Sequence, residues 1–158
     1  MLAVRPAVAA DAPRLLQLMR QLAVFEGYDA QFRVTEHDLL RLGLANTIPA
    51  RFAAFVAQQD GAPACGYAVT YEIPFTYDLR PTLVLKELYV EEAARGCGAG
   101  EALMRRVFAH AGDRGAARLQ WDVLPGNEAA KRFYRRLGGS PVTDWERWHR
   151  DIAPEHSP

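Results

Sequence analysis

The chain has 158 residues, which suffices for one domain with a buried core, and 49% of them are hydrophobic. Basic and acidic residues number 19 each, so no overall positive field would attract nucleic acid or an anionic membrane. No apolar stretch reaches the ~18 residues of a membrane span, and Pro6 interrupts the N-terminal run too early for a signal peptide. Cys65 and Cys97 have neither metal-type spacing nor a disulfide framework, so we expect no metal site and a cytoplasmic location.

The first third of the chain predicts one strand and two helices. Residues 2–8 read as a strand, in which Pro6 favours a sheet edge. Asp11 is the expected N-cap of a helix whose leucines recur at helical spacing and face the core. Thr35 is the expected N-cap of a second helix, since Asp38 stands at the third position and leucines follow.

From residue 51 the period changes to that of strands. Residues 51–58 and 64–71 predict a hairpin, because Gln59-Asp60-Gly61 is a good turn. Residues 83–90 predict a largely apolar strand with Lys86 and Glu87 in its middle. The later elements expected are a helix over 101–111, a strand over 119–123, a helix over 128–137 and one or two strands in 141–152. Without repeats or linkers, this order indicates a single mixed α/β domain over residues 1–158.

A glycine-rich turn joins the strand over 83–90 to the helix over 101–111. Its sequence is Arg95-Gly96-Cys97-Gly98-Ala99-Gly100. Alternate glycines let the backbone turn tightly and approach a ligand closely, while a helix N-terminus presents amide N–H groups and a positive dipole end. The pattern therefore favours a phosphate or pyrophosphate site, although glycine turns also simply connect strands to helices.

Two motifs at their observed spacing carry a family resemblance. The glycine turn is followed about thirty residues later by Asn127 and by Phe133-Tyr134 before Leu137-Gly138. Together they resemble the GNAT superfamily of N-acetyltransferases. More narrowly, the chain is similar to the spermidine/spermine N-acetyltransferase-like group, also called the SSAT-like or thialysine acetyltransferase group. This similarity runs from residue 4 to about residue 150, through stretches 4–7, 22–26, 35–40, 75–78, 88–90 and 126–128.

The resemblance implies a single-domain GNAT-type fold. Its mixed twisted sheet would have splayed central strands and about four flanking helices, with acetyl-CoA lying in the gap between the strands. The cofactor-binding residues implied are Leu88, Tyr89, Val90, Arg95, Gly96, Cys97, Gly98, Ala99, Gly100, Glu101 and Asn127. The charge of Glu101 is not ideal beside a pyrophosphate. Relatives of this kind are commonly homodimers, so the resemblance also implies a dimer.

Acetyl transfer to an amine requires a base, an oxyanion site and an acid. An alkylamine has a pKa near ~10.4 and must lose a proton before it attacks the thioester. Backbone N–H groups at a strand end can polarise the thioester oxygen. The resemblance implies that Tyr134 protonates the departing thiolate. The related proteins usually carry Glu-Asp where this chain has Lys86-Glu87, so Glu87 becomes the base only if a bulge turns it toward the cleft; otherwise the two side chains pair, or a water chain takes the proton.

The acceptor is expected to be a small primary amine. Phe25, Glu26 and Trp145 match substrate-side positions of the related proteins, and Lys86 would stand beside them. A lysine there would repel a polyamine and favour an amino-acid-like amine or one bearing a carboxylate or phosphonate. Two alternatives stay open: acetylation of a protein or peptide amine, and a non-catalytic acyl-CoA sensor.

Overall fold

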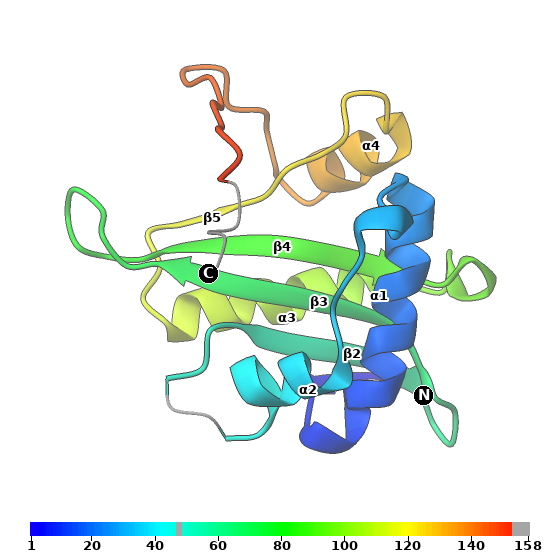
Figure 1. Ribbon diagram of the computed structural model, residues 1–158. Coiled ribbons are helices and arrows are strands. Elements are labelled where there is room, and N and C mark those ends of the chain that lie inside the picture. Colours follow the sequence, from blue (N-terminus) through cyan, green and yellow to red (C-terminus); the bar gives the residue numbers. More distant parts are fainter. Residues whose placement is uncertain (47–48, 153–158) are drawn as a thin grey trace. The chain divides into compact units, whose positions relative to one another are not determined.

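The computed structural model describes residues 1–46 and 49–152, and the chain divides into two compact units. The first unit comprises residues 1–122 and the second begins at residue 123 (Figure 1). The single domain over residues 1–158 stays a prediction.

The first unit is built on a five-stranded sheet in the order β1-β2-β3-β4-β5. Neighbouring strands are antiparallel from β1 to β4, whereas β4 and β5 are parallel. Pro6 ends the edge strand β1, as its missing N–H group predicts. The strands are β1 (Leu2–Pro6), β2 (Ala53–Gln59), β3 (Ala64–Ile73), β4 (Thr82–Val90) and β5 (Arg118–Gln120).

The described residues form four α-helices, and these helices together with the strands confirm the mixed α/β fold expected from the sequence. They are α1 (Ala12–Glu26), α2 (Glu36–Leu39), α3 (Ala99–Asp113) and, in the second unit, α4 (Glu128–Arg136). Thr35 caps α2 as predicted, since its hydroxyl accepts a hydrogen bond from the backbone N–H of Asp38. No helix formed by residues 1–46 and 49–152 is long and apolar enough to cross a membrane.

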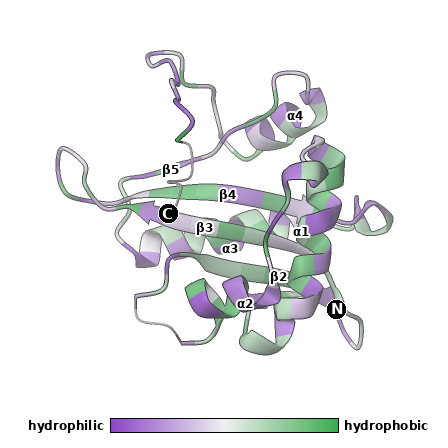
Figure 2. Cartoon of the chain, viewed as in Figure 1, coloured by the Kyte–Doolittle hydropathy of each residue, from purple (hydrophilic) through white to green (hydrophobic). Residues whose placement is uncertain are grey.

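The core of the first unit lies on both faces of the sheet (Figures 1 and 2). On one face, the leucines of α1 pack against Tyr67 and Val69 of β3. On the other face, α3 buries Leu103, Met104 and Val107 against the sheet. The spacing of three or four residues places each set on one side of its helix. The strands between the helices are therefore held from both sides.

Strands β4 and β5 pair over a short stretch only, because β5 has three residues. They pair only from Thr82 to Val84 on β4, opposite Arg118 to Gln120 on β5. Among the described residues of the first unit, no strand pairs with residues 85–90 on this edge of β4. Residues 85–90 therefore form an unpaired stretch on the edge of β4 that faces β5. Their backbone N–H and C=O groups are available to another partner.

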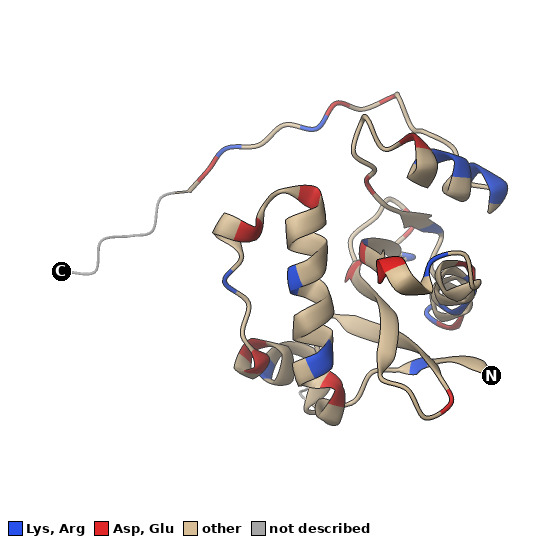
Figure 3. Ribbon diagram, turned by 90° about the vertical axis from the view of Figure 1, so that its right-hand side faces the viewer, with Lys and Arg blue, Asp and Glu red and all other residues tan. Residues whose placement is uncertain are grey.

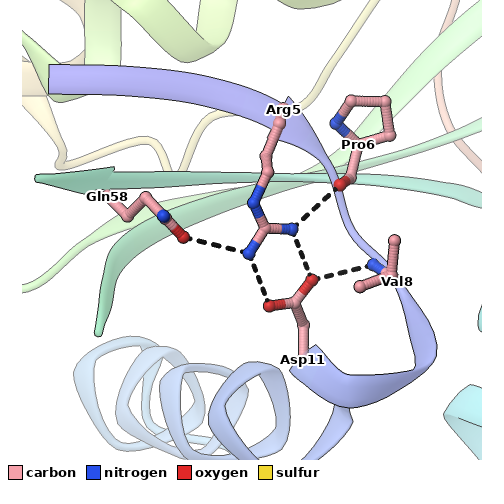
Figure 4. A network of polar contacts seen from close by, with 5 residues as sticks. All are labelled: Arg5, Pro6, Val8, Asp11 and Gln58. Atoms are coloured by element: carbon pink, nitrogen blue, oxygen red, sulfur yellow. Dashed lines mark hydrogen bonds and ion pairs between the residues drawn. The ribbon is translucent and has the colours of Figure 1, made fainter. Parts of the chain in front are cut away.

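Asp11 is the N-cap residue of α1, as predicted, but its side chain makes no capping hydrogen bond to that helix. The carboxylate instead accepts two hydrogen bonds from Arg5, at 2.7 and 2.9 Å, and one of 2.8 Å from the N–H of Val8 (Figure 4). The arginine hydrogen bonds hold the pKa of Asp11 below its ordinary value. The predicted position is therefore confirmed, while Arg5 and Val8 take the carboxylate that would have made the capping hydrogen bond.

The strands expected in residues 141–152 are absent. Every residue of this stretch is irregular, apart from a bend at Asp144. A strand needs a hydrogen-bonding neighbour, and the apolar residues of this stretch do not follow the two-residue period of a strand. The prediction for this stretch is therefore wrong.

Candidate active site

The glycine-rich turn has the backbone conformation that its sequence predicts. Gly96 and Gly98 have φ values of 80° and 88°, in the left-handed region that favours glycine. A Cβ atom at either position would meet no atom within 4 Å, so backbone conformation rather than lack of space requires these glycines. Gly98 is the N-cap residue of α3 and provides no side-chain hydrogen bond to the first amide groups of this 15-residue helix. An anion is the natural partner of such a helix end.

Arg95 places a positive charge at the start of this turn. Its Nε donates a hydrogen bond of 3.2 Å to the carbonyl oxygen of Val90, the last residue of β4. Its guanidinium lies 5.2 Å from the ring centre of Phe25 and 5.9 Å from that of Tyr89. The sequence predicted that Phe25 packs on the substrate, whereas the structure puts its ring against the arginine of the glycine turn.

Two other side chains near the turn have internal partners. The carboxylate of Glu101 accepts a hydrogen bond of 2.8 Å from Arg105, one helical turn later, which offsets its negative charge near the N-terminus of α3. The thiol of Cys97 donates to the carbonyl oxygen of Ala94 at 2.7 Å.

A β-bulge at Lys86 decides which of Lys86 and Glu87 shares the face of Val69. Val69 of β3 pairs with Glu87, but the next residue, Thr70, pairs with Leu85, so Lys86 is the extra residue of β4. In a regular ladder, Lys86 would stand opposite Val69 and share its face of the sheet. The bulge gives that place to Glu87 and leaves Lys86 exposed. The bulge that the sequence required for Glu87 to act as a base is present, and the role of Glu87 stays a prediction.

Glu87 is largely enclosed and hydrogen-bonded to one tyrosine. The hydroxyl of Tyr67 donates to Oε2 of Glu87 at 2.8 Å, and Tyr67 itself is fully buried. Burial raises the pKa of Glu87, while the Tyr67 hydrogen bond and the charge of Lys86 act in the opposite direction. The pKa of Tyr67 is also raised, first by burial and then by the charge of Glu87. The tyrosine therefore stays a hydrogen-bond donor.

The end of α1 contributes further groups to this site. Gly27 ends the helix in the left-handed conformation with φ 80°. It stands between the exposed Glu26, the last residue of α1, and Tyr28, which is half-buried. Burial, and then the charges of Glu87 and Glu26, raise the pKa of Tyr28 to about 12. Glu26 in turn contributes to the raised pKa of Glu87. Two carboxylates and two tyrosines thus share one electrostatic environment, which suits a cationic amine.

The remaining predicted residues belong to the second unit. Asn127 caps α4 as expected, because its Oδ1 accepts a hydrogen bond of 3.0 Å from the N–H of Ala130. Tyr134 lies on α4 with its ring edge-on to that of Phe133 at 5.2 Å. Trp145 lies in the irregular stretch after α4. The helix also carries four basic residues, drawn blue in Figure 3: Lys131, Arg132, Arg135 and Arg136.

The arrangement in the first unit combines an anion site with an enclosed carboxylate. The glycine turn, the N-terminus of α3 and Arg95 fit a pyrophosphate, and the open edge of β4 fits a chain of amide groups such as pantetheine. A carboxylate with a raised pKa is a more effective proton acceptor near neutral pH than an ordinary one. In residues 1–46 and 49–152, no three His, Cys, Asp or Glu side chains gather as a metal-ligand set.

The sequence did not identify Tyr67 or Tyr28 as members of the site. A signal for Tyr67 was present, because a tyrosine in a strand buried on both faces needs a partner for its hydroxyl. The partner of this hydroxyl, Glu87, could not be predicted from the sequence, because the bulge places Glu87 on the same face as Tyr67. Tyr28 depends on the turn after α1, which the sequence marked only as a helix break.

The chain matches the family model of the acetyltransferase (GNAT) family over residues 15–139. Among curated proteins it is 29% identical to the thialysine N-epsilon-acetyltransferase of Bos taurus, over 92% of this chain and 88% of that protein. It is also 29% identical to the human spermidine/spermine N(1)-acetyltransferase-like protein 1, over 92% of this chain and 21% of that protein. These relatives confirm the narrower resemblance to the SSAT-like group.

Solved structures confirm the fold. An aminoglycoside acetyltransferase from a soil metagenomic sample, in complex with sisomicin, is 17% identical and superposes with a TM-score of 0.79 over 96% of this chain and 97% of that chain. The ribosomal-protein-alanine N-acetyltransferase of Brucella melitensis, 19% identical, superposes with a TM-score of 0.74 over 97% of this chain and 100% of that chain. The chain therefore belongs to the GNAT family of acetyltransferases, whose acetyl donor is acetyl-CoA.

Proposed function

We propose that the chain transfers the acetyl group of acetyl-CoA to a primary amine of a small molecule, with Glu87 as the general base. The bulge at Lys86 is the observation that carries this proposal, because it puts Glu87 on the enclosed face of β4. Burial raises the pKa of the Glu87 carboxylate, which improves the match between this base and neutral pH. The non-catalytic sensor loses its main support, since the replacement of the relatives' glutamate by Lys86 leaves a carboxylate in the site.

In the proposed reaction, each proton has a defined donor and acceptor. Glu87 takes a proton from the ammonium group of the acceptor, directly or through one water, and becomes a neutral carboxylic acid. The amine nitrogen then attacks the thioester carbon, the carbon–sulfur bond breaks, and the departing thiolate takes a proton from the hydroxyl of Tyr134. The nitrogen, positively charged after the attack, releases its second proton through water to the Tyr134 oxygen, which restores the hydroxyl. Backbone N–H groups of β4 near Leu88 polarise the thioester oxygen in the tetrahedral state. Glu87 finally returns its proton to solvent.

The cofactor is proposed to lie along β4 and the glycine turn. Leu88, Tyr89 and Val90 offer backbone groups to pantetheine, and the amides of residues 96–101 together with Arg95 hold the pyrophosphate. The φ values of Gly96 and Gly98 and the absence of a side-chain cap on α3 support this assignment. Asn127 completes it through its side-chain amide, whose oxygen also caps α4.

The proposed acceptor is amino-acid-like. The curated relatives named thialysine N-epsilon-acetyltransferases support a primary amine on a side chain that resembles lysine. Glu26 and Glu87 supply negative charge for the ammonium group, while the exposed Lys86 next to them favours an acceptor that also carries an anionic group. Trp145 is proposed to pack on the apolar part of the acceptor.

Thiol release from acetyl-CoA tests this function. The panel contains lysine, thialysine, spermidine, an aminophosphonate and a lysine-containing peptide, each followed by mass detection of the acetylated amine. We expect turnover with the lysine-like amines and at least tenfold lower kcat/KM with spermidine. Tight CoA binding without turnover on any amine would refute the catalytic proposal, and exclusive turnover on the peptide would replace the small-molecule acceptor.

Assembly and location form the remaining part of the proposal. A homodimer is supported by the resemblance to the SSAT-like group and by the apolar hairpin tip between β3 and β4, where Phe75 and Tyr77 are exposed. Light scattering at micromolar concentration measures the assembly directly. A cytoplasmic location is supported by two free cysteines, Cys65 and Cys97.

A further inference from the structure

Tyr67 is a polar side chain placed in the middle of the sheet. It is the largest fully buried side chain of the described residues, and its ring packs with the leucines of α1. A buried hydroxyl without a partner costs free energy, so a phenylalanine would serve the packing better if packing were the only requirement. The hydroxyl has one hydrogen bond, of 2.8 Å, and its acceptor is Oε2 of Glu87.

The register of the sheet explains why these two side chains meet. Tyr67 pairs with Tyr89, and Val69 pairs with Glu87, so residues 67, 69, 87 and 89 share the face that α1 covers. Tyr67 and Glu87 are diagonal neighbours on that face. Because the bulge at Lys86 lies beside this pair, the contact exists only in the bulged register.

The hydrogen bond makes the two oxygens of the Glu87 carboxylate different. Oε2 accepts from Tyr67, whereas Oε1 has no hydrogen-bond partner among the described residues. Oε1 is not one of the fully buried polar atoms without a partner, so part of its surface is exposed within the described structure. A general base must present a lone pair to the proton that it accepts.

We propose that Tyr67 is a positioning residue for acetyl transfer: its hydroxyl holds Oε2 of Glu87 and leaves Oε1 as the atom that takes the proton from the acceptor amine. This rests on the proposed function, in which Glu87 is the base. Tyr67 touches neither substrate nor cofactor and acts through Glu87. After the transfer, the proton resides on Oε1 and Tyr67 still donates to Oε2, so the carboxyl group keeps its orientation through the cycle.

The groups around Glu87 fix the direction of the expected pH effect. They are Tyr67 from β3, Lys86 from β4, and Glu26 and Tyr28 from the end of α1. The tyrosine hydrogen bond and Lys86 favour the ionised carboxylate, while burial and Glu26 oppose it. Removing the Tyr67 hydroxyl therefore raises the pKa of Glu87 further, and the acid limb of the kcat/KM profile moves to higher pH.

The Tyr67→Phe variant tests the proposal, with Tyr71→Phe as the matched control. Tyr71 lies on the same strand and face, and its hydroxyl has no partner among the described residues. We expect Tyr67→Phe to lower kcat roughly tenfold with an unchanged KM for acetyl-CoA, because a hydrogen bond to a charged group is lost. Its acid limb should move to higher pH, whereas Tyr71→Phe should match the wild type. An unmoved acid limb in Tyr67→Phe would refute the positioning role.

Two further measurements separate this proposal from the proposed function. In a Glu87→Gln background, Tyr67→Phe should cost almost nothing, because its effect passes through Glu87; a full additional loss would overturn the proposal. Carboxyl-carbon NMR of Glu87 follows its titration without any acceptor. We expect the titration to move to higher pH in Tyr67→Phe even if no amine of the panel turns over. An unchanged titration would contradict the contact itself, whether or not the chain is active.

Discussion

Lys86 and Glu87 are neighbours in the chain, yet the bulge in β4 gives them different environments. Lys86 is exposed and stands opposite no residue of β3, whereas Glu87 pairs with Val69 and reaches the hydroxyl of Tyr67. The two charges still interact, because Lys86 lowers the pKa of Glu87 against the effect of burial. A bulge of one residue thus leaves the charge of Lys86 at the surface and encloses the carboxylate of Glu87.

Reversing the charge of Lys86 should change the choice of acceptor. In Lys86→Glu, we expect kcat/KM for spermidine to rise about threefold to tenfold relative to a lysine-like amine, because an exposed charge beside the site steers ligands. Arg20→Glu, an equal charge change on the exposed side of α1, is the control and should leave the ratio unchanged. The ratio is measured at two salt concentrations, and an equal rise in both variants would contradict a local effect.

The burial of Glu87 should cost stability at neutral pH. A carboxyl whose pKa is raised in the folded state contributes stability that is present below its unfolded pKa and is lost as pH rises through its folded pKa. Glu87→Gln should therefore have a higher Tm than the wild type at pH 7, and the difference should shrink as the pH falls toward 4. Thermal unfolding followed by circular dichroism measures this difference. A gap that does not depend on pH would show that charge burial is not its cause.

The glycine turn should be sensitive to an added methyl group, whereas a glycine near the C-terminal end of α3 should tolerate one. Gly98→Ala puts a side chain at φ 88°, which costs about 1–2 kcal/mol and should raise the Kd for CoA at least tenfold. Gly112→Ala lies in α3, where a Cβ meets open space, and should stabilise the helix by about 0.5–1 kcal/mol. Calorimetric titration with CoA compares them. Equal affinities would remove the turn from the cofactor site.

Tyr134 should affect the rate and not the affinity for the cofactor. In Tyr134→Phe the ring remains and the proton donor is lost, so kcat should fall about 10²-fold while the Kd for CoA stays within twofold. Tyr77→Phe, at the exposed hairpin tip, is the control. If chemistry depends on this proton, a donor thioester with a better leaving thiolate should recover part of the rate in Tyr134→Phe. Normal turnover in this variant would exclude Tyr134 from the mechanism.

Local chemistry made some parts of the structure predictable from the sequence. The caps at Thr35 and Asn127 each need one side chain and one nearby amide, and both are present. The turn at Gly96 and Gly98 needs a backbone conformation that glycine adopts readily, and both residues adopt it. These features depend on residues that are close in the chain.

The features that the sequence missed depend on residues far apart. Arg5 takes the carboxylate of Asp11 away from its expected cap, and no local pattern weighs that competition. Residues 141–152, where the sequence analysis expects strands, have no paired neighbouring strand. The sequence could state the bulge at Lys86 only as a condition for Glu87 as a base, because the whole β3–β4 ladder sets the register. The contact of Tyr67 with Glu87 depends on that same register.

The role of Glu87 as the general base is tested by the rate of acetyl transfer in a single turnover of the Glu87→Gln variant. The enzyme is saturated with acetyl-CoA and mixed with the best amine of the panel at pH 7, and Glu72→Gln on the same hairpin serves as the control. Glu72 pairs with Arg114 rather than with the site, so its variant should retain at least half of the wild-type rate. We expect the single-turnover rate of Glu87→Gln to fall 10²–10⁴-fold, with an unchanged affinity for CoA. A rate for Glu87→Gln that equals that of Glu72→Gln would contradict this role.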